Sequence, residues 1–380
     1  MDQKQFEVLR AEIEDYVRGP AEEFGEEIEK THLVPRRLWE DLSSRGYLRL
    51  AAPKEYGGMG IALTRYVDLL EIFSMAHASI RMIVHVSNGI WRAIDRFATA
   101  EQRDMFVKPQ VNGDIRVAFT LTEPTAGTGA DIRTSVVRRG DTYFLSGEKH
   151  LITFGVNCDY WLLFARLERT IGQDGVVALM VDRNSPGVTV NSMPDSMGVR
   201  GTDHAHLIFD GTPVPIANRL GDEGQGLEVA FSGFLTPSRI CVAMSCVGLA
   251  RRAQELAVEH AKKRHTFGKP LASRQSIAFA LAENATDIEA ARQLVKYAAS
   301  RFEEGDQLDT MYASMAKLNA VDMLTRVTDK ALQIHGGIGY WEPNPIERIY
   351  RDARAQRFEE GTNEVQKALV SRAILTNVDQ

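Results

Sequence analysis

The chain has 380 residues, of which 44% are hydrophobic and 25% charged, a composition that is ordinary for a globular protein. Its net charge of −6 argues against a nucleic-acid-binding surface, and because no run of about 18 apolar residues occurs, we expect no membrane span. The three cysteines, Cys158, Cys241 and Cys246, have no CxxC spacing. We therefore expect neither disulfides nor a metal site, and a cytoplasmic protein.

Residues 1 to 115 are predicted to form a helical N-terminal domain. Apolar residues recur at helical spacing in FEVLRAEIEDYV and in ALTRYVDLLEIFSMA. SIRMIVHVSNGIWRAIDRF is a further predicted helix, which is too apolar for a surface position. Thr99 and Gln102 have the spacing of a capping box at the start of another helix.

Residues 116 to 224 contain short runs rich in β-branched and aromatic residues. TSVVRRGDTYFLSGEKHLITFG fits two strands around a Gly-Asp turn, and YWLLFARLE and GVVALMVDR continue the series. No helical pattern lies between these runs. We therefore predict a β-barrel or sandwich rather than alternating strands and helices.

The helical pattern returns over residues 225 to 380. Three long segments and the closing TNEVQKALVSRAIL, joined by short loops, indicate an antiparallel four-helix bundle. We expect a bend in the first segment near Pro237. The predicted fold is therefore a multidomain α+β protein with helical, β and helical domains in that order.

Four segments contain residues that could bind a ligand. They are FTLTEPTAGTGADIRT (119–134), KHLITFG (149–155), KKRHTFGKPLASRQ (262–275) and QIHGGIGYWEPNPIERIYRDARAQRFEEGTNEVQK (333–367). Taken singly, each has an ordinary interpretation as a turn, a strand or a solvated loop. No GxGxxG or GxxxxGK[ST] fingerprint is present, which disfavours a Rossmann or P-loop nucleotide site.

Taken together, the order and spacing of these segments resemble the acyl-CoA dehydrogenase family over nearly the whole chain. The resemblance rests on TEPxAG, K-x-x-IT, R-x-TFGKPL, Q-x-x-GGxGY, and RDAR followed by EGT. It implies the three-domain fold of that family, a tightly bound FAD and a CoA thioester substrate. It also implies an electron-transfer flavoprotein as partner, and assembly as a homotetramer or homodimer.

The resemblance also implies a role for individual residues. Contacts with FAD are implied for Phe119, Leu121, Thr122, Thr128, Ile152, Thr153, Arg264, Thr266, Phe267, Gln275, Gln333, Gly336, Gly337, Thr362 and Glu364. Thr153 would bond flavin N5, whereas the groups around Arg264 and Gln333 would reach the FAD of a neighbouring subunit. Contacts with the substrate are implied for Arg81, Ser87, Thr128, Arg239 and Gly361.

Two adjacent carboxylates, Glu359 and Glu360, precede Gly361. The family's usual catalytic glutamate stands directly before Gly-Thr, so the resemblance identifies Glu360 as the base. It would take the α-proton while hydride leaves the β-carbon for flavin N5, giving a 2-enoyl-CoA. Burial raises the pKa of a carboxyl group and suits it to this task. In an extended segment the two side chains would point oppositely, and Glu359 would be solvated or would raise the pKa of Glu360.

Arg81 lies within a strongly apolar predicted helix, where an unpaired charge would be costly. One interpretation is an interdomain ion pair with a protein carboxylate. The other rests on a resemblance to glutaryl-CoA dehydrogenases, which carry an arginine at the matching place for the distal carboxylate of the substrate. With Ser87 and Asn88 it would form a polar pocket end, so we expect a short acyl-CoA with a polar or anionic end.

Other functions remain open for this sequence. The same fold could serve a decarboxylating glutaryl-CoA-type dehydrogenase, an acyl-CoA lyase or desulfinase, an oxidase, or a non-enzymatic scaffold protein. Some relatives place the base just before an arginine of the long helix. Here that position is Ser238, before Arg239, and because a serine cannot serve as this base, the pattern favours Glu360.

Overall fold

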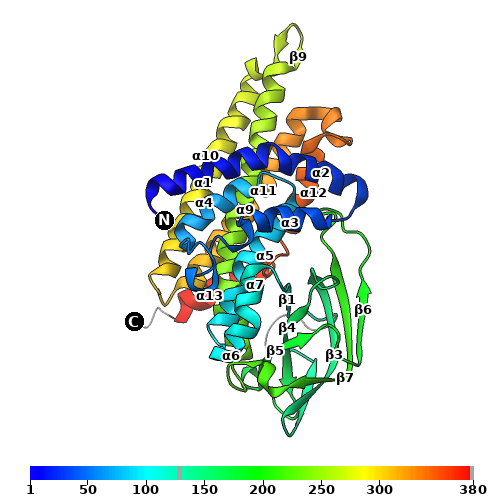
Figure 1. The fold of residues 1–380 in the computed structure, drawn as a ribbon. Helices are drawn as coiled ribbons and strands as arrows, with labels where there is room; N and C mark the ends of the chain where they lie inside the picture. Colours follow the sequence, from blue (N-terminus) through cyan, green and yellow to red (C-terminus); the bar gives the residue numbers. More distant parts are fainter. Residues whose placement is uncertain (126–130, 377–380) are drawn as a thin grey trace.

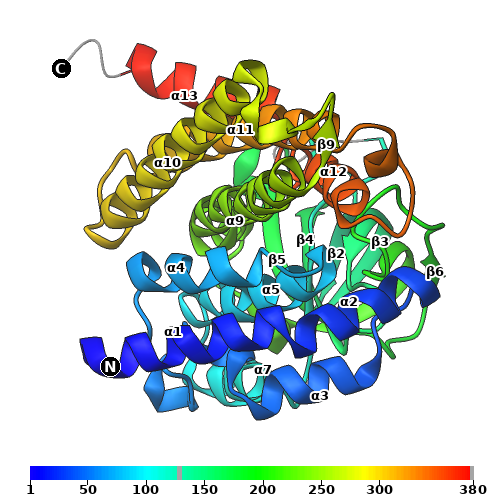
Figure 2. The same ribbon diagram turned by 90° about the horizontal axis from the view of Figure 1, so that it is seen from above.

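The computed structural model describes residues 1–125 and 131–376, which fold as helices, then strands, then helices, as predicted. The N-terminal helices and the C-terminal helices lie side by side, and the strands pack against one end of both groups (Figure 1). Seen from above, α4 and α5 lie between the outer N-terminal helices and the long helices of the C-terminal part (Figure 2). The three parts therefore meet around α5 and α9.

The N-terminal part is helical throughout. It consists of α1 (Gln3–Arg18), α2 (Pro20–Thr31), α3 (Arg36–Ser44), α4 (Leu63–Phe73), α5 (Ala78–Asp95), α6 (Ala100–Gln102) and α7 (Lys108–Asn112), with 3-10 turns at Tyr47–Arg49 and Lys54–Tyr56 and a π-helical turn at Arg103–Val107. The predicted capping box is confirmed, because the Thr99 hydroxyl accepts from the Gln102 N–H and the Gln102 side chain accepts from the Thr99 N–H.

The strands of the central part form one mixed sheet. They are β1 (Val117–Thr120), β2 (Ser135–Arg139), β3 (Thr142–Thr153), β4 (Tyr160–Leu167), β5 (Val176–Asp182), β6 (Val188–Ser192), β7 (His204–Pro215) and β8 (Arg219–Leu220). In the described part of the chain they follow the order β6-β7-β3-β2-β4-β5-β8, and β1 pairs with β4 in parallel. The predicted hairpin at Gly140 and Asp141 joins β2 to β3.

The C-terminal part is again helical, apart from a two-stranded hairpin. It consists of α8 (Gly226–Glu228), a π-helical turn (Val229–Leu235), α9 (Thr236–Lys263), β9 (His265–Thr266), β10 (Lys269–Pro270), α10 (Gln275–Glu303), α11 (Asp309–His335), a 3-10 turn (Gly336–Tyr340), α12 (Pro345–Ala355) and α13 (Asn363–Thr376). A π-helical turn ends at Leu235, and Pro237 lies in the first turn of α9, where a proline is tolerated.

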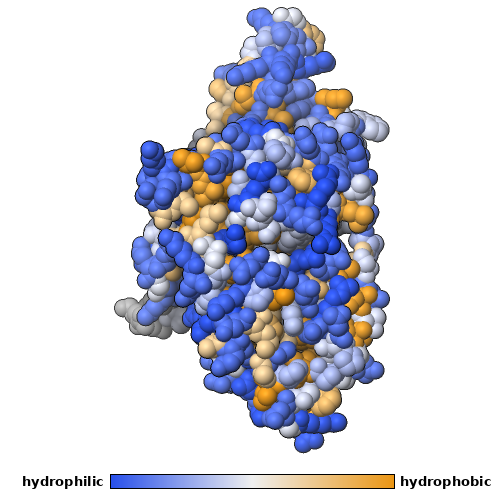
Figure 3. Space-filling model, viewed as in Figure 1, coloured by the Kyte–Doolittle hydropathy of each residue, from blue (hydrophilic) through white to orange (hydrophobic). Residues whose placement is uncertain are grey.

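The stretch Gly226–Lys263 is long and apolar enough to cross a membrane by length and composition, with a mean hydropathy of 1.4 in its most apolar window. Polar residues interrupt this stretch, so it contains no continuous apolar run of about 18 residues. The whole of that window is buried inside the structure, which is the position of a core helix. Polar residues cover most of the molecular face in Figure 3.

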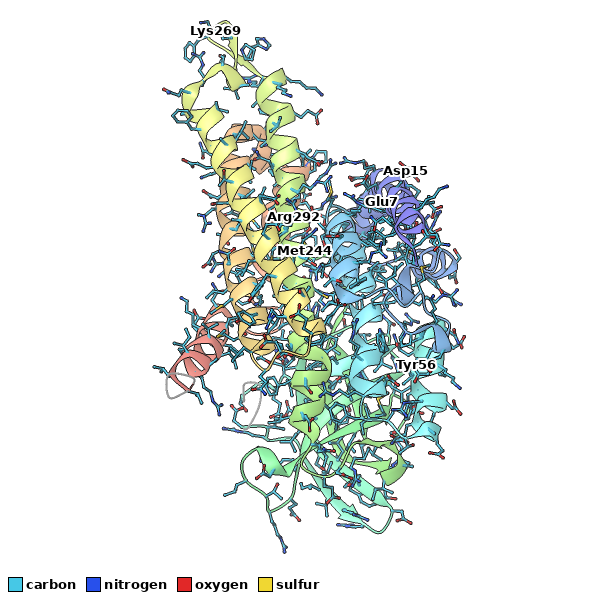
Figure 4. All side chains as sticks on the ribbon, turned by 90° about the vertical axis from the view of Figure 1, so that its left-hand side faces the viewer. Glu7, Asp15, Tyr56, Met244, Lys269 and Arg292 are labelled. Carbon is cyan, nitrogen blue, oxygen red and sulfur yellow. The ribbon has the colours of Figure 1, made fainter. Side chains whose placement is uncertain are left out.

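A buried carboxylate ties the N-terminal helices to the C-terminal bundle. Glu71 on α4 is 6% exposed and accepts from Arg292 of α10 at 2.8 and 2.9 Å and from Arg251 of α9 at 3.4 Å. A side chain at Gly248 of α9 would meet the main-chain oxygen of Glu71 at 2.1 Å, so this glycine allows α9 to approach α4 closely. Figure 4 shows Arg292 and, close by, Met244 at the level where these helices meet.

We expect Glu71→Gln to lower the free energy of unfolding by roughly 1–3 kcal/mol, because Arg251 and Arg292 would lose the buried carboxylate that they share and keep only the more exposed Glu255 and Glu289 as counter-ions. Denaturant midpoints measure the loss. The control is Glu259→Gln on α9, whose partner Lys263 and own side chain are 76% and 57% exposed. The control should leave the midpoint nearly unchanged, and equal losses in the two variants would contradict the role of Glu71.

Candidate active site

The turn between α12 and α13 carries the two adjacent glutamates. The Glu359 N–H donates to Ala355 O at 3.3 Å, and the Gly361 N–H donates to Phe358 O at 3.3 Å. Glu360 has a φ of 53° and Gly361 a φ of 98°, so the chain reverses sharply at this point. The expectation of an extended segment is therefore wrong, and of the two alternatives for Glu359, the one in which its charge raises the pKa of Glu360 agrees with the structure. Both carboxylates bond groups on other helices.

Glu359 pairs with Arg81 across the interface between α5 and the turn. Arg81 Nη1 and Nη2 donate to the two oxygens of Glu359, each at 2.9 Å, and Arg81 is only 1% exposed. Burial raises the pKa of Glu359, but the charge and the hydrogen bonds of Arg81 outweigh this effect and hold the pKa below its usual range. The ion-pair interpretation of Arg81 is confirmed, and Glu359 is not a solvated bystander.

Glu360 is held by a different contact. Ser238 Oγ on α9 donates to Glu360 Oε1 at 2.8 Å, and His85 Nε2 on α5 lies 2.8 Å from the same Ser238 oxygen. Burial raises the pKa of Glu360, the Ser238 hydrogen bond opposes this effect, and the charge of Glu359 adds to it. The net pKa is raised, so Glu360 is the more basic of the two carboxylates.

Three side chains fix the main chain of the turn by four hydrogen bonds. Arg239 Nε donates to Glu360 O at 3.2 Å, Lys317 Nζ to Gly361 O at 2.5 Å, and Gln366 Nε2 to both oxygens at 3.1 Å. Among the described residues, the N–H of Glu360 donates to no acceptor. Arg239 Nη1 is also buried without a partner. Buried donors of this kind can bind an oxygen of a ligand.

The end of β1 offers main-chain groups at an unpaired strand edge, to which the edge of a flavin ring can bind. β4 is the only strand that pairs with β1 in the part of the chain that the structure describes, so the other edge of β1 has no strand partner. Lys149 Nζ of β3 binds the segment that follows β1, because it donates to Leu121 O and to Glu123 Oε1, each at 2.9 Å. The His150 N–H donates to Thr122 O at 2.8 Å, so Leu121 and Thr122 are tied to β3 directly after the unpaired edge of β1.

Thr153 presents its hydroxyl group next to His204 of β7. Thr153 Oγ1 lies 3.2 Å from His204 Nε2, and His204 Nδ1 lies 3.0 Å from Thr202 O. Because a carbonyl can only accept, Nδ1 carries the hydrogen, and Nε2 accepts from the hydroxyl. Burial lowers the pKa of His204, which keeps this tautomer neutral. The Thr153 oxygen keeps lone pairs for an N–H of a ligand, which a reduced flavin has at N5, and to donate to N5 of an oxidised flavin the hydroxyl would have to turn from His204. With this adjustment Thr153 and the β1 edge fit a bound FAD.

The remaining predicted cofactor residues lie elsewhere. Arg264, Thr266, Phe267, Gln275, Gln333, Gly336 and Gly337 lie on the β9–β10 hairpin, at the start of α10 and at the end of α11, and all but the half-buried Thr266 are exposed. The hairpin lies at the end of the molecule away from the sheet, as Figure 1 and the label of Lys269 in Figure 4 show. A single chain therefore does not bring these residues to Glu360.

The predicted substrate residues are only partly brought together. Arg81, Arg239 and Gly361 surround the two glutamates, but Ser87 lies about 240° around α5 from Arg81. The side chain of Asn88 is committed to the main chain of Tyr47, Ala51 and Val84. The expected pocket end made by Arg81, Ser87 and Asn88 is therefore not formed.

The other predicted residues fall near the turn or the sheet. Ile152 is buried at the end of β3, and Phe119 stacks on Phe234 at 4.5 Å between ring centroids. Thr362 and Glu364 lie at the start of α13. Thr128 lies outside the described residues.

Sequence reasoning missed several residues of this site. His85 and Lys317 are charged or titratable residues on buried helix faces, as Arg81 is, and this pattern could have indicated both of them. The sequence argues only that Ser238 cannot serve as a base, and its hydrogen bond to Glu360 is visible only in the structure. His204 gave no signal, because its contact with Thr153 depends on the pairing of β3 with β7.

Comparisons with known proteins agree with the geometry. Models of the N-terminal, middle and C-terminal domains of acyl-CoA dehydrogenase match residues 3–114, 118–212 and 224–375. An acyl-CoA dehydrogenase of Bacillus subtilis is 36% identical over 371 residues, which cover 97% of each chain.

Solved structures are similar over the full length. Butyryl-CoA dehydrogenase from Megasphaera elsdenii has a TM-score of 0.90 and 35% identity over 97% of this chain and 98% of its own. A chain in a structure described as the electron transferring flavoprotein of Acidaminococcus fermentans has a TM-score of 0.93 and 34% identity. It covers 99% of this chain and 100% of its own.

We expect the Arg81–Glu359 pair to show strong coupling in a double-mutant cycle. Arg81→Gln and Glu359→Gln should each cost about 3 kcal/mol, because each leaves a buried group without its partner, and the double variant should lose clearly less than the sum. Denaturant unfolding measures the coupling, and additive losses would contradict it.

The same pair gives the unfolding free energy a defined pH dependence. Because the pKa of Glu359 is lowered on folding, its contribution is complete above the unfolded value of about 4.3 and is lost as the pH falls through the lower folded value. The stability difference between the wild type and Glu359→Gln should therefore shrink at acid pH. A difference that grows at acid pH would contradict the assignment.

Proposed function

Because the chain belongs to the acyl-CoA dehydrogenase family, we propose that it oxidises a short acyl-CoA to the 2-enoyl-CoA with Glu360 as the catalytic base. The family is FAD-dependent, so FAD is the cofactor of this protein. The observation that carries the proposal is the half-buried Glu360 side chain, whose pKa is raised and whose main-chain N–H is uncommitted among the described residues. A base and a donor for the thioester oxygen thus belong to one residue.

The residues of the chain divide the reaction between them. Glu360 Oε2 takes the α-proton, because Oε1 is committed to Ser238. The Glu360 N–H donates to the thioester oxygen, on which negative charge develops as the α-proton leaves. Arg239 and Lys317 hold the carbonyls of Glu360 and Gly361 and so anchor the turn that carries this N–H. When bound, FAD supplies the two-electron acceptor.

The butyryl-CoA dehydrogenase relative supports a short acyl chain. A polar or anionic acyl end is the second candidate, and the buried Arg81 favours it. In the structure both guanidinium nitrogens of Arg81 are committed to Glu359, so an anionic acyl end would have to share or displace this carboxylate. We therefore propose a neutral or polar short chain first and an anionic chain second.

We propose an electron-transfer flavoprotein as the electron acceptor, which the similarity to a chain of the Acidaminococcus fermentans structure supports. We also propose a homo-oligomer, because the exposed cofactor residues of the hairpin lie away from the β1 edge of the same chain. The three free, buried cysteines fit the cytoplasm, which we propose as its compartment.

We expect Glu360→Gln to keep its FAD but to lose about 100-fold or more of the rate of flavin reduction by butyryl-CoA, because the base is gone. Glu359→Gln should retain most of the rate. The acid limb of the pH–rate profile of Glu359→Gln should move to lower pH. The reason is that removing the like charge and freeing Arg81 lowers the pKa of Glu360.

Anaerobic bleaching of the flavin, followed against pH, measures both effects. Equal losses in the two variants would contradict the assignment of Glu360. Stoichiometric oxygen uptake without another acceptor would indicate an oxidase, and a protein that binds neither FAD nor CoA esters would indicate a scaffold function.

The acyl end can be tested with glutaryl-, succinyl-, butyryl- and octanoyl-CoA. If an anionic end binds Arg81, Glu359→Gln should raise the rate ratio of glutaryl-CoA to butyryl-CoA, and Arg81→Gln should lower it. FAD content and the melting temperature show beforehand that each variant is folded. An unchanged ratio in both variants would exclude Arg81 as the carboxylate site and leave the neutral short chain.

A further inference from the structure

Three side chains from three distant segments form one continuous hydrogen-bonded chain that ends at the base. His85 of α5, Ser238 of α9 and Glu360 of the turn are joined by two contacts of 2.8 Å each. His85 is 2% exposed and Ser238 is 3% exposed. The contact between His85 and Ser238 is therefore shielded from water, where hydrogen bonds are stronger, and the contact between Ser238 and the half-buried Glu360 is partly shielded.

The direction of each hydrogen bond follows from the chemistry of its acceptor. An ionised carboxylate can only accept, so the Ser238 hydroxyl hydrogen points at Glu360 Oε1. Ser238 Oγ then has only lone pairs for His85, and Nε2 of His85 must carry the hydrogen. His85 Nδ1 is buried without a partner, as the unprotonated nitrogen of this tautomer would be.

His85 cannot readily reverse this order by taking up a second proton. Burial, followed by the charge of Arg81 one helical turn away, lowers the pKa of His85 to about 3. Near neutral pH it is therefore a neutral donor with a fixed direction. Its N–H holds the Ser238 oxygen, and this leaves the Ser238 hydrogen for Glu360.

From this geometry we infer that Ser238 and His85 are positioning residues for the catalytic base. Ser238 binds Oε1 and leaves Oε2 for the α-proton, and His85 keeps the Ser238 hydroxyl aimed at the carboxylate. This inference rests on the proposed function of Glu360 as the base. Ser238 thus acts as a hydrogen-bond donor to Glu360 and not as a base.

The charged and titratable groups around Glu360 set the background for any pH effect. Glu359 precedes it in the turn, Arg239 and Cys241 come from α9, Lys317 comes from α11, and Arg81 and His85 come from α5. Glu359 opposes ionisation of Glu360, whereas Arg239 and Lys317 favour it. Removing the Ser238 hydroxyl changes none of these charges, so a shift in Ser238→Ala reports the hydrogen bond itself.

The experiment follows the ionisation of Glu360 in the FAD-loaded protein by two readouts. The first is the pH dependence of flavin reduction by butyryl-CoA. The second uses no substrate and records the carboxyl stretch in infrared difference spectra between pH steps, with Glu360→Gln identifying the band. Ser238→Ala should raise both apparent pKa values by about one pH unit, because a hydrogen bond to the ionised form is lost.

The controls separate positioning from packing. Ser245→Ala removes another buried hydroxyl of α9, which donates to Cys241 O at 2.9 Å, and should shift neither readout. Ser238→Thr retains a hydroxyl and should restore most of the wild-type value. His85→Phe should raise the pKa by a smaller amount, whereas His85→Gln, which keeps an N–H donor near the position of Nε2, should restore it.

Each outcome decides the inference. Matching shifts in the kinetic and infrared readouts for Ser238→Ala, absent in Ser245→Ala, support it. If the wild type is reduced by butyryl-CoA but Ser238→Ala and Ser245→Ala titrate alike, the positioning role is wrong and the proposed function stands. If none of the four CoA esters reduces the flavin of the wild type, the proposed function falls and this inference falls with it.

Discussion

The ion pair between Arg81 and Glu359 is the contact on which the arrangement of the site depends. Two adjacent carboxylates cannot both be buried as charges without a counter-ion, because desolvation and mutual repulsion add. Arg81 removes this conflict by bonding both oxygens of Glu359 at 2.9 Å. Because Arg81 belongs to α5 and Glu359 to the turn before α13, the same pair also fixes the turn against the N-terminal helices.

The pair gives the two glutamates opposite properties within one dipeptide. Arg81 holds the pKa of Glu359 below its usual range, whereas burial and the charge of Glu359 raise the pKa of Glu360. A permanently charged group thus stands beside a group that can exchange a proton. The left-handed conformation of Glu360, with a φ of 53°, lets both side chains reach inward from consecutive positions.

Much of the fold could be predicted from the sequence because it depends on local pattern. The apolar spacing of residues 62–76 and the Gly140–Asp141 turn act over a few residues, and the capping box of Thr99 acts over three. The proposal of Glu360 as the base followed from the EGT motif. The Ser238 contact did not, because it joins positions 122 residues apart and depends on how α9 meets the turn. The expectation of an extended segment failed because nothing in EEGT shows that a glutamate would adopt a left-handed conformation.

The distribution of donors around the turn shows which groups remain for a substrate. Arg81 is committed to Glu359, Lys317 to Gly361 O, and Ser238 to Glu360 Oε1. Among the uncommitted groups around the turn in the described part of the chain are Oε2 of Glu360, its main-chain N–H, and Nη1 of Arg239. One is an acceptor for a proton and two are donors for an oxygen. Removal of a proton next to a carbonyl needs this combination, because the base and the stabilisation of the developing oxyanion must act on neighbouring atoms.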